Sequence, residues 1–235
     1  MKAGKSAKAP QKRNADATRA KILQAALTEF SERGLPEAST DAIAERCGVN
    51  KRMIYYYFGS KEGLYLSALE SVFEKLVALE NKIEVEHLEP AAAIEAMINL
   101  KIDYYLENPH FVSFLAMENF HKARHLRKSK KLNMFKTPLT DVIARILKRG
   151  QRSGQFRRDV EPVDFYVSIC ALCIMYFSNQ HSLGVIFERE MTSPASIARR
   201  KRTVVEFVLG YLQNSDAVAV QPARRGPARH ASLVS

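Results

Sequence analysis

The sequence has little of what several classes of protein require. Its 235 residues include only three cysteines, too few and too oddly counted for a disulfide framework, which indicates a reducing compartment. It contains no glycine-rich phosphate loop, no nucleophile elbow and no marked pair of carboxylates, so we expect neither an enzyme nor a cofactor. Alternating apolar runs bounded by turn residues are also absent, which leaves an all-α fold as the expectation.

Export and membrane signals are missing as well. The N-terminus is basic but no apolar core follows it, so it does not look like a secretory signal, and we expect a cytoplasmic protein. The segment 165–187 has no Asp, Glu, Lys or Arg, yet polar residues at 178–182 leave an apolar run of only about a dozen residues. Because a membrane span needs about 20 residues, we interpret this segment as a buried helix and expect no membrane partner.

Positive charge, by contrast, is abundant. The formal net charge is +11 and the isoelectric point is about 9.6, which favours a polyanionic partner such as DNA, RNA or an anionic membrane. Hydrophobic residues make up 46% of the chain, enough for a substantial core.

Residues 39–58 have the pattern of two short helices joined by a tight turn. Ser39 or Thr40 can cap the first helix, because a hydroxyl can accept free N–H groups at a helix start. Gly48 suits the turn, where φ is often positive, and Asn50 can cap a second helix of about two turns. The pattern predicts a helix-turn-helix motif.

The second of these helices carries cations and phenols on its outward side. Lys51 and Tyr55, like Arg52 and Tyr56, are four residues apart and share a face. Arginine and lysine suit guanine edges and phosphates, and tyrosine hydroxyls suit phosphate oxygens. We therefore expect double-stranded DNA as the partner, with these contact residues: Thr40, Lys51, Arg52, Met53, Tyr55, Tyr56, Tyr57 and Lys61.

The same residues resemble the TetR-type family of transcriptional repressors. The resemblance covers about residues 17–69 and rests on the order FSERG (30–34), ST (39–40), IA (43–44), GVNK (48–51), IYYYF (54–58) and KEGL (61–64). It implies an all-helical homodimer that binds an operator and releases it when a small molecule enters the C-terminal domain. Members of the family often have Gly and Thr where this chain has Arg52 and Met53, which indicates a distinctive operator.

The chain divides into four segments. Residues 1–15 are basic and read as a disordered tail, or alternatively as an arm that reaches along the DNA. Residues 16–62 form the expected DNA-binding domain of three helices, and a long helix from about Lys61 to Ile83 would join it to a helical ligand-binding and dimerisation domain at 63–213. Residues 214–235, rich in Ala, Pro, Gly and Arg, read as a second disordered tail.

The last two long helices are apolar around much of their circumference. Such helices must be covered on every side, which favours pairing with a second copy over a purely intramolecular core. The family resemblance implies the same, since the last two helices of the family form a four-helix dimer interface. The candidate contacts are Tyr166, Cys173, Tyr176, Phe177, Phe207 and Tyr211.

A ligand pocket is expected between the middle helices and the uncharged one. Its candidate walls, which could equally be ordinary core, are Tyr104, Phe114, Met117, Phe120, His121 and Met175. Phe, Met and Tyr walls suit an apolar or aromatic ligand, whereas the surrounding positive charge would favour an acidic one. The C-terminal half is loosely similar to pyrimidine-sensing regulators, through Asn108-Pro109 and Asp164-Phe165, but this resemblance assigns no ligand.

Three further groups are better explained structurally. Glu118, His121 and His125 could share one helical face as metal ligands, but they lie in a cationic run, so we expect no metal. Cys170 and Cys173 fit a packed helix better than an oxidant sensor. The run 121–158 holds thirteen Lys or Arg against one acid and reads as a solvated face, or alternatively as an auxiliary anion site.

The function predicted from these observations is a ligand-responsive transcriptional regulator, most simply a repressor, that binds an inverted-repeat operator as a homodimer and is released by a small molecule. The alternative is an architectural DNA-binding protein without ligand control. A ligand-dependent change in operator affinity separates the two.

Overall fold

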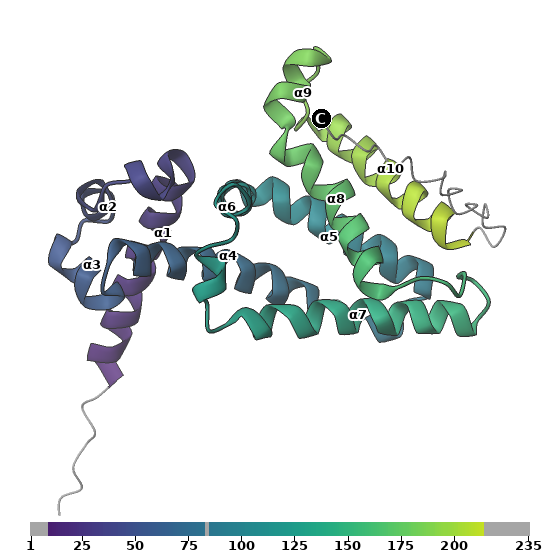
Figure 1. Cartoon of the computed structure of the whole chain (residues 1–235), viewed down its shortest axis with the longest axis horizontal. Helices are drawn as coiled ribbons and strands as arrows, with labels where there is room; N and C mark the ends of the chain where they lie inside the picture. The colour runs from purple at the N-terminus through teal and green to yellow at the C-terminus, as the bar shows by residue number, and fades with distance from the viewer. Residues whose placement is uncertain (1–8, 83–84, 214–235) are drawn as a thin grey trace, which may run out of the picture.

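The computed structural model describes residues 9–82 and 85–213. Helices alone form the regular structure of these residues, with no strand, so the all-α prediction is confirmed (Figure 1). The α-helices are α1 (Ala9–Glu37), α2 (Thr40–Cys47), α3 (Lys51–Phe58), α4 (Lys61–Glu80), α5 (Pro90–Glu107), α6 (Pro109–Phe120), α7 (Leu132–Arg152), α8 (Pro162–Ser178), α9 (Gln180–Ile186) and α10 (Pro194–Gln213).

Helix α1 begins earlier than the sequence predicted. Residues 9–15 are helical and continuous with the rest of α1, so the expectation of a disordered tail at 1–15 is wrong for them. Pro10 does not oppose this, because proline fits the first turn of a helix, where its missing N–H has no intrahelical partner. The remainder of the predicted N-terminal tail, residues 1–8, and the predicted tail at 214–235 lie outside the described residues.

The N-terminal domain is a small bundle of α1, α2 and α3 against the start of α4. The side chains at its centre that have no exposed surface include Ile22, Phe30, Ile43 and Ile54. Gly34, at φ 69°, breaks the helical path of α1 before a last turn at residues 35–37, as expected for a glycine that ends a helix. The chain can then turn into α2 at once.

Helix α4 joins the two halves of the molecule. Ser60 caps it by accepting a hydrogen bond from the backbone N–H of Gly63 at 3.0 Å. A Cβ at Gly63 would lie 2.1 Å from the carbonyl oxygen of Phe58, so only glycine allows α4 to start this close to the end of α3. From there α4 packs on α1 and then on α5, α6 and α7, which couples the recognition motif to the C-terminal body.

The C-terminal body is built around α5, which packs against α7, α8 and α10. The buried side of α8 repeats at helical spacing through Phe165, Ile169, Cys173 and Phe177.

No single helix of the described ranges is long and apolar enough for a membrane span. Helices α8 and α9 reach that length and composition only as a pair, and the pair is bent by 66°.

Candidate DNA-binding surface and the helical body behind it

The recognition motif is capped as the sequence predicted. The Oγ of Ser39 accepts hydrogen bonds from the backbone N–H groups of Asp41 and Ala42, and the side-chain oxygen of Asn50 accepts one from Arg52 at 2.9 Å. Gly48 ends α2 in the left-handed conformation, at φ 66° and ψ 33°. These contacts fix the angle between α2 and α3 with local hydrogen bonds.

Helix α3 has one buried side and one open side. Ile54 is fully buried, and Phe58 packs on the core under the guanidinium of Arg19, whose carbon lies 5.1 Å from the ring centroid. Met53 and Tyr57 are partly buried against the same core. These two predicted contact residues therefore sit at the edge of the open side.

The open side of α3 presents the predicted cation and phenols. Arg52 is exposed, as is Tyr56, with 78% of its surface free. Tyr55 is 43% exposed, and its hydroxyl lies 3.4 Å from the Oγ1 of Thr40. Thr40 itself is only 7% exposed. We correct its predicted role as a direct phosphate contact: in this structure it packs behind Tyr55.

Lys51 and Lys61 already have partners on the protein. The ammonium of Lys51 is 2.7 Å from a carboxylate oxygen of Asp41, and this hydrogen bond raises the pKa of Lys51, so the side chain stays charged. The ammonium of Lys61 donates to the carbonyl oxygen of Pro36 at 3.1 Å. Both lysines lie on the surface in exposed contacts, which a phosphate can replace.

A buried carboxylate braces the motif from behind, and the sequence analysis missed it. Glu29 on α1 is 2% exposed and accepts a hydrogen bond from the backbone N–H of Ser39 at 3.0 Å. Arg33 lies 3.5 Å from one of its oxygens and Arg46 on α2 lies 3.8 Å from the other. The spacing of Glu29 and Arg33 by four residues was the available signal.

A second buried carboxylate lies where the N-terminal domain meets α6. Glu118 accepts hydrogen bonds from the Tyr65 hydroxyl at 3.2 Å, from the backbone N–H of Leu126 at 3.0 Å, and contacts Nδ1 of His125 at 2.7 Å. Burial opposes ionisation of Glu118, but the Leu126 N–H and His125 outweigh it, so the pKa of Glu118 is lowered. His121 does not join them, and the described residues contain no group of three potential metal ligands.

The third buried carboxylate holds the far end of α4. Lys101 on α5 has no exposed surface; its ammonium contacts Glu80, the last residue of α4, and donates to the Tyr166 hydroxyl on α8 at 2.8 Å. That hydroxyl in turn lies 3.3 Å from Glu80. Burial raises the pKa of Tyr166 far above its usual range, so the phenol remains a hydrogen-bond donor. One charged network thus ties α4, α5 and α8 together.

The predicted ligand-pocket residues do not gather around one space. Phe120 and Met175 are 83% and 52% exposed, so their assignment to an enclosed pocket is wrong. Tyr104 and Phe114 are buried in the core, where the Tyr104 hydroxyl donates to the carbonyl oxygen of Val72 at 2.6 Å. Sequence spacing put most of these side chains on the correct helices, although α6 ends at Phe120 and His121 lies just beyond it. It could not tell which side of each helix the neighbouring helices cover.

A cavity of about 260 Å³ does lie in the predicted place, between α5, α6 and the start of α9, but other residues line it. Its apolar wall includes Tyr105, Val112 and Phe177, and its polar groups include Ser113 and His181. Its walls thus combine apolar surface with several polar groups, and both are used in small-molecule sites.

The predicted dimer contacts divide into two sets. Cys173 and Phe177 are buried within the single chain and Tyr166 points into the charged network, so their assignment to a dimer interface is wrong. Tyr176 also has an internal partner, since its hydroxyl donates to the carbonyl oxygen of Met191 at 2.8 Å. Phe207 and Tyr211 on α10 are 67% and 46% exposed and remain available.

The environment of the two cysteines of α8 disfavours their thiolate forms. Burial raises the pKa of Cys173 to about 12 and also raises that of Cys170. A raised pKa keeps the thiol protonated, and the thiolate is the reactive form. The packed-helix interpretation of this pair fits these environments.

Comparison with known proteins matches both halves of the chain to one family. Residues 22–68 match "Bacterial regulatory proteins, tetR family" and residues 90–208 match "Tetracyclin repressor-like, C-terminal domain". The HTH-type transcriptional repressor NicS of Pseudomonas putida is 38% identical over 170 residues, which cover 72% of this chain and 80% of that protein. The regulator RutR of Escherichia coli is 37% identical over 97 residues, 41% of this chain and 45% of its own.

Solved structures share the fold. The fatty acid degradation regulator FadR from Bacillus halodurans aligns over 82% of this chain and 95% of its own, with a TM-score of 0.65 and 18% identity. The ketosteroid transcriptional regulator KstR2 of Mycobacterium tuberculosis aligns over 83% and 94%, with a TM-score of 0.61 and 19% identity.

Proposed function

The chain belongs to the TetR family of bacterial transcriptional regulators, and from this membership we propose that it is a repressor that binds an inverted-repeat operator as a homodimer and is released by a small-molecule effector. Relatives named as repressors support the direction of control. We propose no catalytic activity.

The observation that carries this proposal is the open side of α3. It is the outer side of a short helix, held at a fixed angle by capped termini, and it presents Arg52, Tyr55 and Tyr56 to the surroundings. A helix of this size fits the DNA major groove, where an arginine can make two hydrogen bonds to one guanine.

The other contact residues have supporting roles in this proposal. Lys51 exchanges its carboxylate partner Asp41 for a phosphate, and Lys61 turns from the Pro36 carbonyl to the backbone of the DNA. Tyr56 and Tyr57 donate to phosphate oxygens, and Met53 makes an apolar contact in the groove. Thr40 acts indirectly, by holding the Tyr55 hydroxyl.

The effector acts through α4 in this proposal. One end of α4 starts against the last turn of α3 at Gly63, and the other end is held by Glu80 in the network with Lys101 and Tyr166. A ligand that shifts α5 or α8 therefore moves a helix that touches the recognition motif. It favours a dimer in which the two α3 helices are spaced wrongly for successive grooves.

We place the effector in the 260 Å³ cavity between α5, α6 and the start of α9. The volume admits a small, mainly apolar or aromatic molecule anchored by Ser113 or His181. Ser113→Trp fills the cavity, so it should abolish release of the operator by any active compound from a library of small aromatic and acidic metabolites. Operator binding without the compound should stay within about twofold of the unsubstituted protein, because Ser113 lies on α6, away from α3.

Selection from genomic fragments tests the proposed function. The purified full chain is incubated with the fragments, and the recovered site is titrated in increasing salt. We expect an inverted repeat whose half-sites lie about 34–36 Å apart, bound by a dimer much more tightly than random DNA. Salt-sensitive binding with no sequence preference would instead support the architectural alternative.

A further inference from the structure

The connection between α6 and α7 carries a cluster of exposed cations that the DNA-binding motif does not include. Its residues 121–131 contain no carboxylate, and the exposed residues of this connection are all cations: Lys122, Arg124, Arg127, Lys128 and Lys130. We call residues 122–130 the basic loop. None of the five cations has an ion pair within the described ranges, whereas Lys131 lies 2.6 Å from Glu74 and 3.4 Å from Glu70.

Buried hydrogen bonds fix the basic loop in place. Glu118, which is 1% exposed, accepts hydrogen bonds from the backbone N–H groups of His125 at 3.2 Å and Leu126 at 3.0 Å. Ser129, which is also buried, donates to Glu70 on α4 at 2.6 Å. The inward side chains thus hold the loop while the cations between them point to the surface. Charges on a fixed loop lose little conformational entropy when they bind, which favours a partner of fixed geometry.

The basic loop borders the start of α4, where the recognition motif ends. The ring of His125 packs on Tyr65, with the centroids 4.8 Å apart, and Tyr65 lies about 6 Å along α4 from Lys61. The pKa of Glu62 is lowered, first by a hydrogen bond from its own backbone N–H and also by the positive charges of Lys61 and Lys128. Figure 1 shows the connection between α6 and α7 on the side of the C-terminal body that is nearest the N-terminal domain.

The last turn of α6, just before the basic loop, lies against the α1 kink. The sulfur of Met117 is 3.4 Å from the position that a Cβ of Gly34 would take. Two residues beyond this glycine, the carbonyl oxygen of Pro36 accepts the hydrogen bond from the ammonium of Lys61. Both ends of the contact between the two domains therefore bring the loop close to Lys61, one of the predicted phosphate contacts.

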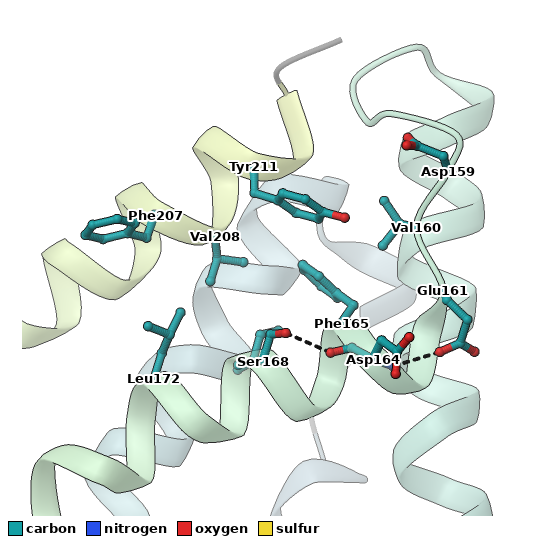
Figure 2. A pocket seen from close by; sticks show the side chains of 11 residues that line it. Asp159, Val160, Glu161, Asp164, Phe165, Ser168, Leu172, Phe207, Val208 and Tyr211 are labelled. Carbon is teal, nitrogen blue, oxygen red and sulfur yellow. Dashed lines mark hydrogen bonds between the residues drawn. The ribbon is translucent and has the colours of Figure 1, made fainter. Parts of the chain in front are cut away.

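Acidic side chains gather at a different end of the body. Glu161 and Asp164 have no ion pair in the described part of the chain, and they line a cavity of about 390 Å³ between the start of α8 and the end of α10 (Figure 2). Helix α7, which begins directly after the basic loop and is about 30 Å long, ends near this cavity. The body is therefore basic beside the recognition motif, and this charge attracts a polyanion to the same side as α3.

We infer that the basic loop is a second DNA contact, through which the C-terminal body binds phosphates of the strand that continues past Lys61. This inference rests on the proposed DNA-binding function and deepens it. One DNA strand carries a negative charge about every 3.4 Å, so an offset of about 6 Å along α4 corresponds to roughly two phosphates. Contacts to phosphates carry no sequence information, so the loop adds affinity and salt dependence without changing base preference.

The all-cationic surface of the loop favours a phosphate backbone over an acidic protein. The centre of a protein interface is poor in charge and rich in apolar and aromatic side chains. Here each exposed position of the basic loop is lysine or arginine, the two residue types that commonly contact DNA phosphates. An acidic protein partner is therefore the second choice, and the experiment below separates it from DNA.

The test removes two charges from the loop and compares the loss with a matched change elsewhere. The variant is Arg127→Gln with Lys128→Gln, because neither side chain has a hydrogen bond or ion pair to another described residue. The control is Arg152→Gln with Arg158→Gln, which removes the same charge from exposed positions at the end of α7 and just beyond it. Both full-length double variants are titrated with the selected operator and with a random duplex over a series of salt concentrations.

The loop variant should lose affinity for both kinds of DNA by at least about tenfold at 0.1 M salt. Each lost phosphate contact lowers the slope of log affinity against log salt by about 0.9, and a dimer has two loops, so the slope should fall by roughly 2–4. The preference for operator over random DNA should remain. The control should keep its slope within about 0.5 of the unsubstituted protein, because its charges lie far from the DNA.

Equal changes in the loop variant and the control would show an effect of net charge alone and would overturn the inference. An unchanged slope in the loop variant also overturns it and leaves an acidic protein as the partner of the loop. Ethylation interference then locates the contacts: the phosphates lost in the loop variant should neighbour those lost in Lys61→Ala without coinciding with them. The random duplex keeps this test separate from the proposed repressor function, which fails only if the selection recovers no operator.

Discussion

Two regions of the molecule, the surface around α3 and the far end of α4, use charge in opposite ways. Around α3 the cations are on the surface, and Lys51 and Lys61 hold partners that they can exchange. At the far end of α4, Glu80, Lys101 and Tyr166 form a network in which the ammonium of Lys101 has no exposed surface. Exposed pairs contribute little to stability and respond to a ligand, whereas a buried pair is costly to break and holds helices in place. In the proposed function, the exposed charges of the first region bind DNA and the buried network of the second transmits the effect of the ligand.

The largest expected effect comes from breaking the buried pair. Lys101→Met removes the ammonium and leaves Glu80 charged in the interior, so the free energy of unfolding should fall by about 3–5 kcal/mol. Denaturant unfolding of the purified chain measures it. The paired change Lys101→Met with Glu80→Gln should recover much of the loss, because no buried charge then remains.

A half-exposed pair provides the matched control for that substitution. Lys201 lies 2.6 Å from Asp103, with 28% and 47% of their side-chain surfaces exposed. Lys201→Met should cost less than about 1 kcal/mol. If the two methionine variants lost equal stability, the contrast between buried and exposed charge would not hold.

The next prediction concerns which cation, Arg52 or Lys61, recognises the base sequence of the DNA. Arg52→Ala should cost about 1–3 kcal/mol of discrimination between the operator and mismatched sites, because in the proposed role the exposed Arg52 meets base edges. Lys61→Ala should instead weaken all sequences alike and reduce the slope of affinity against salt by about one. Titration of specific and random DNA with both variants measures this. If both variants lost the same affinity for operator and for random DNA, the assignment of base reading to Arg52 and phosphate contact to Lys61 would be wrong.

A smaller effect should appear at low pH, at the junction of the two halves. The pKa of Glu118 is lowered in the folded chain by the Leu126 N–H and by His125, despite burial. A lowered carboxyl pKa contributes stability that is complete above the unfolded value of about 4.3 and is lost as the pH falls through the folded value. The melting temperature of the unsubstituted chain should thus decline more steeply below about pH 4.3 than that of Glu118→Gln. Parallel curves would show that Glu118 does not contribute in this range.

Much of the recognition motif could be predicted from the sequence, because it is built from local rules. Ser39, Gly48 and Asn50 act on residues two to four positions away, so spacing alone identifies their roles. The C-terminal body follows no such rule. Whether Phe120 faces the core or the solvent depends on where other helices pass, and a lysine such as Lys101 gives no local signal that it is fully buried.

The 260 Å³ cavity between α5, α6 and the start of α9 shows a second limit of prediction from sequence spacing. The sequence put a ligand site between the middle helices and the uncharged one, which is where the 260 Å³ cavity lies, because helix order constrains which elements can meet. It did not predict the walls of this cavity, because His181 reaches it only through the 66° bend between α8 and α9, and Met175 lies on the exposed side of α8. That bend is a feature of packing that helical periodicity does not encode.

The smallest predicted effect concerns the exposed pair of Lys51 and Asp41 and its influence on the affinity for DNA. Asp41 holds Lys51 at 2.7 Å in the free protein, so DNA has to displace a carboxylate before a phosphate can take its place. Asp41→Asn removes that competitor and one negative charge near the DNA, and should tighten binding to operator and random DNA alike by about twofold at low salt. The gain should disappear in high salt, where exposed charges are screened, whereas the stability loss of Lys101→Met should persist because its pair is buried. DNA titration of Asp41→Asn and denaturant unfolding of Lys101→Met, each at two salt concentrations, therefore decide whether the two regions differ as their burial predicts.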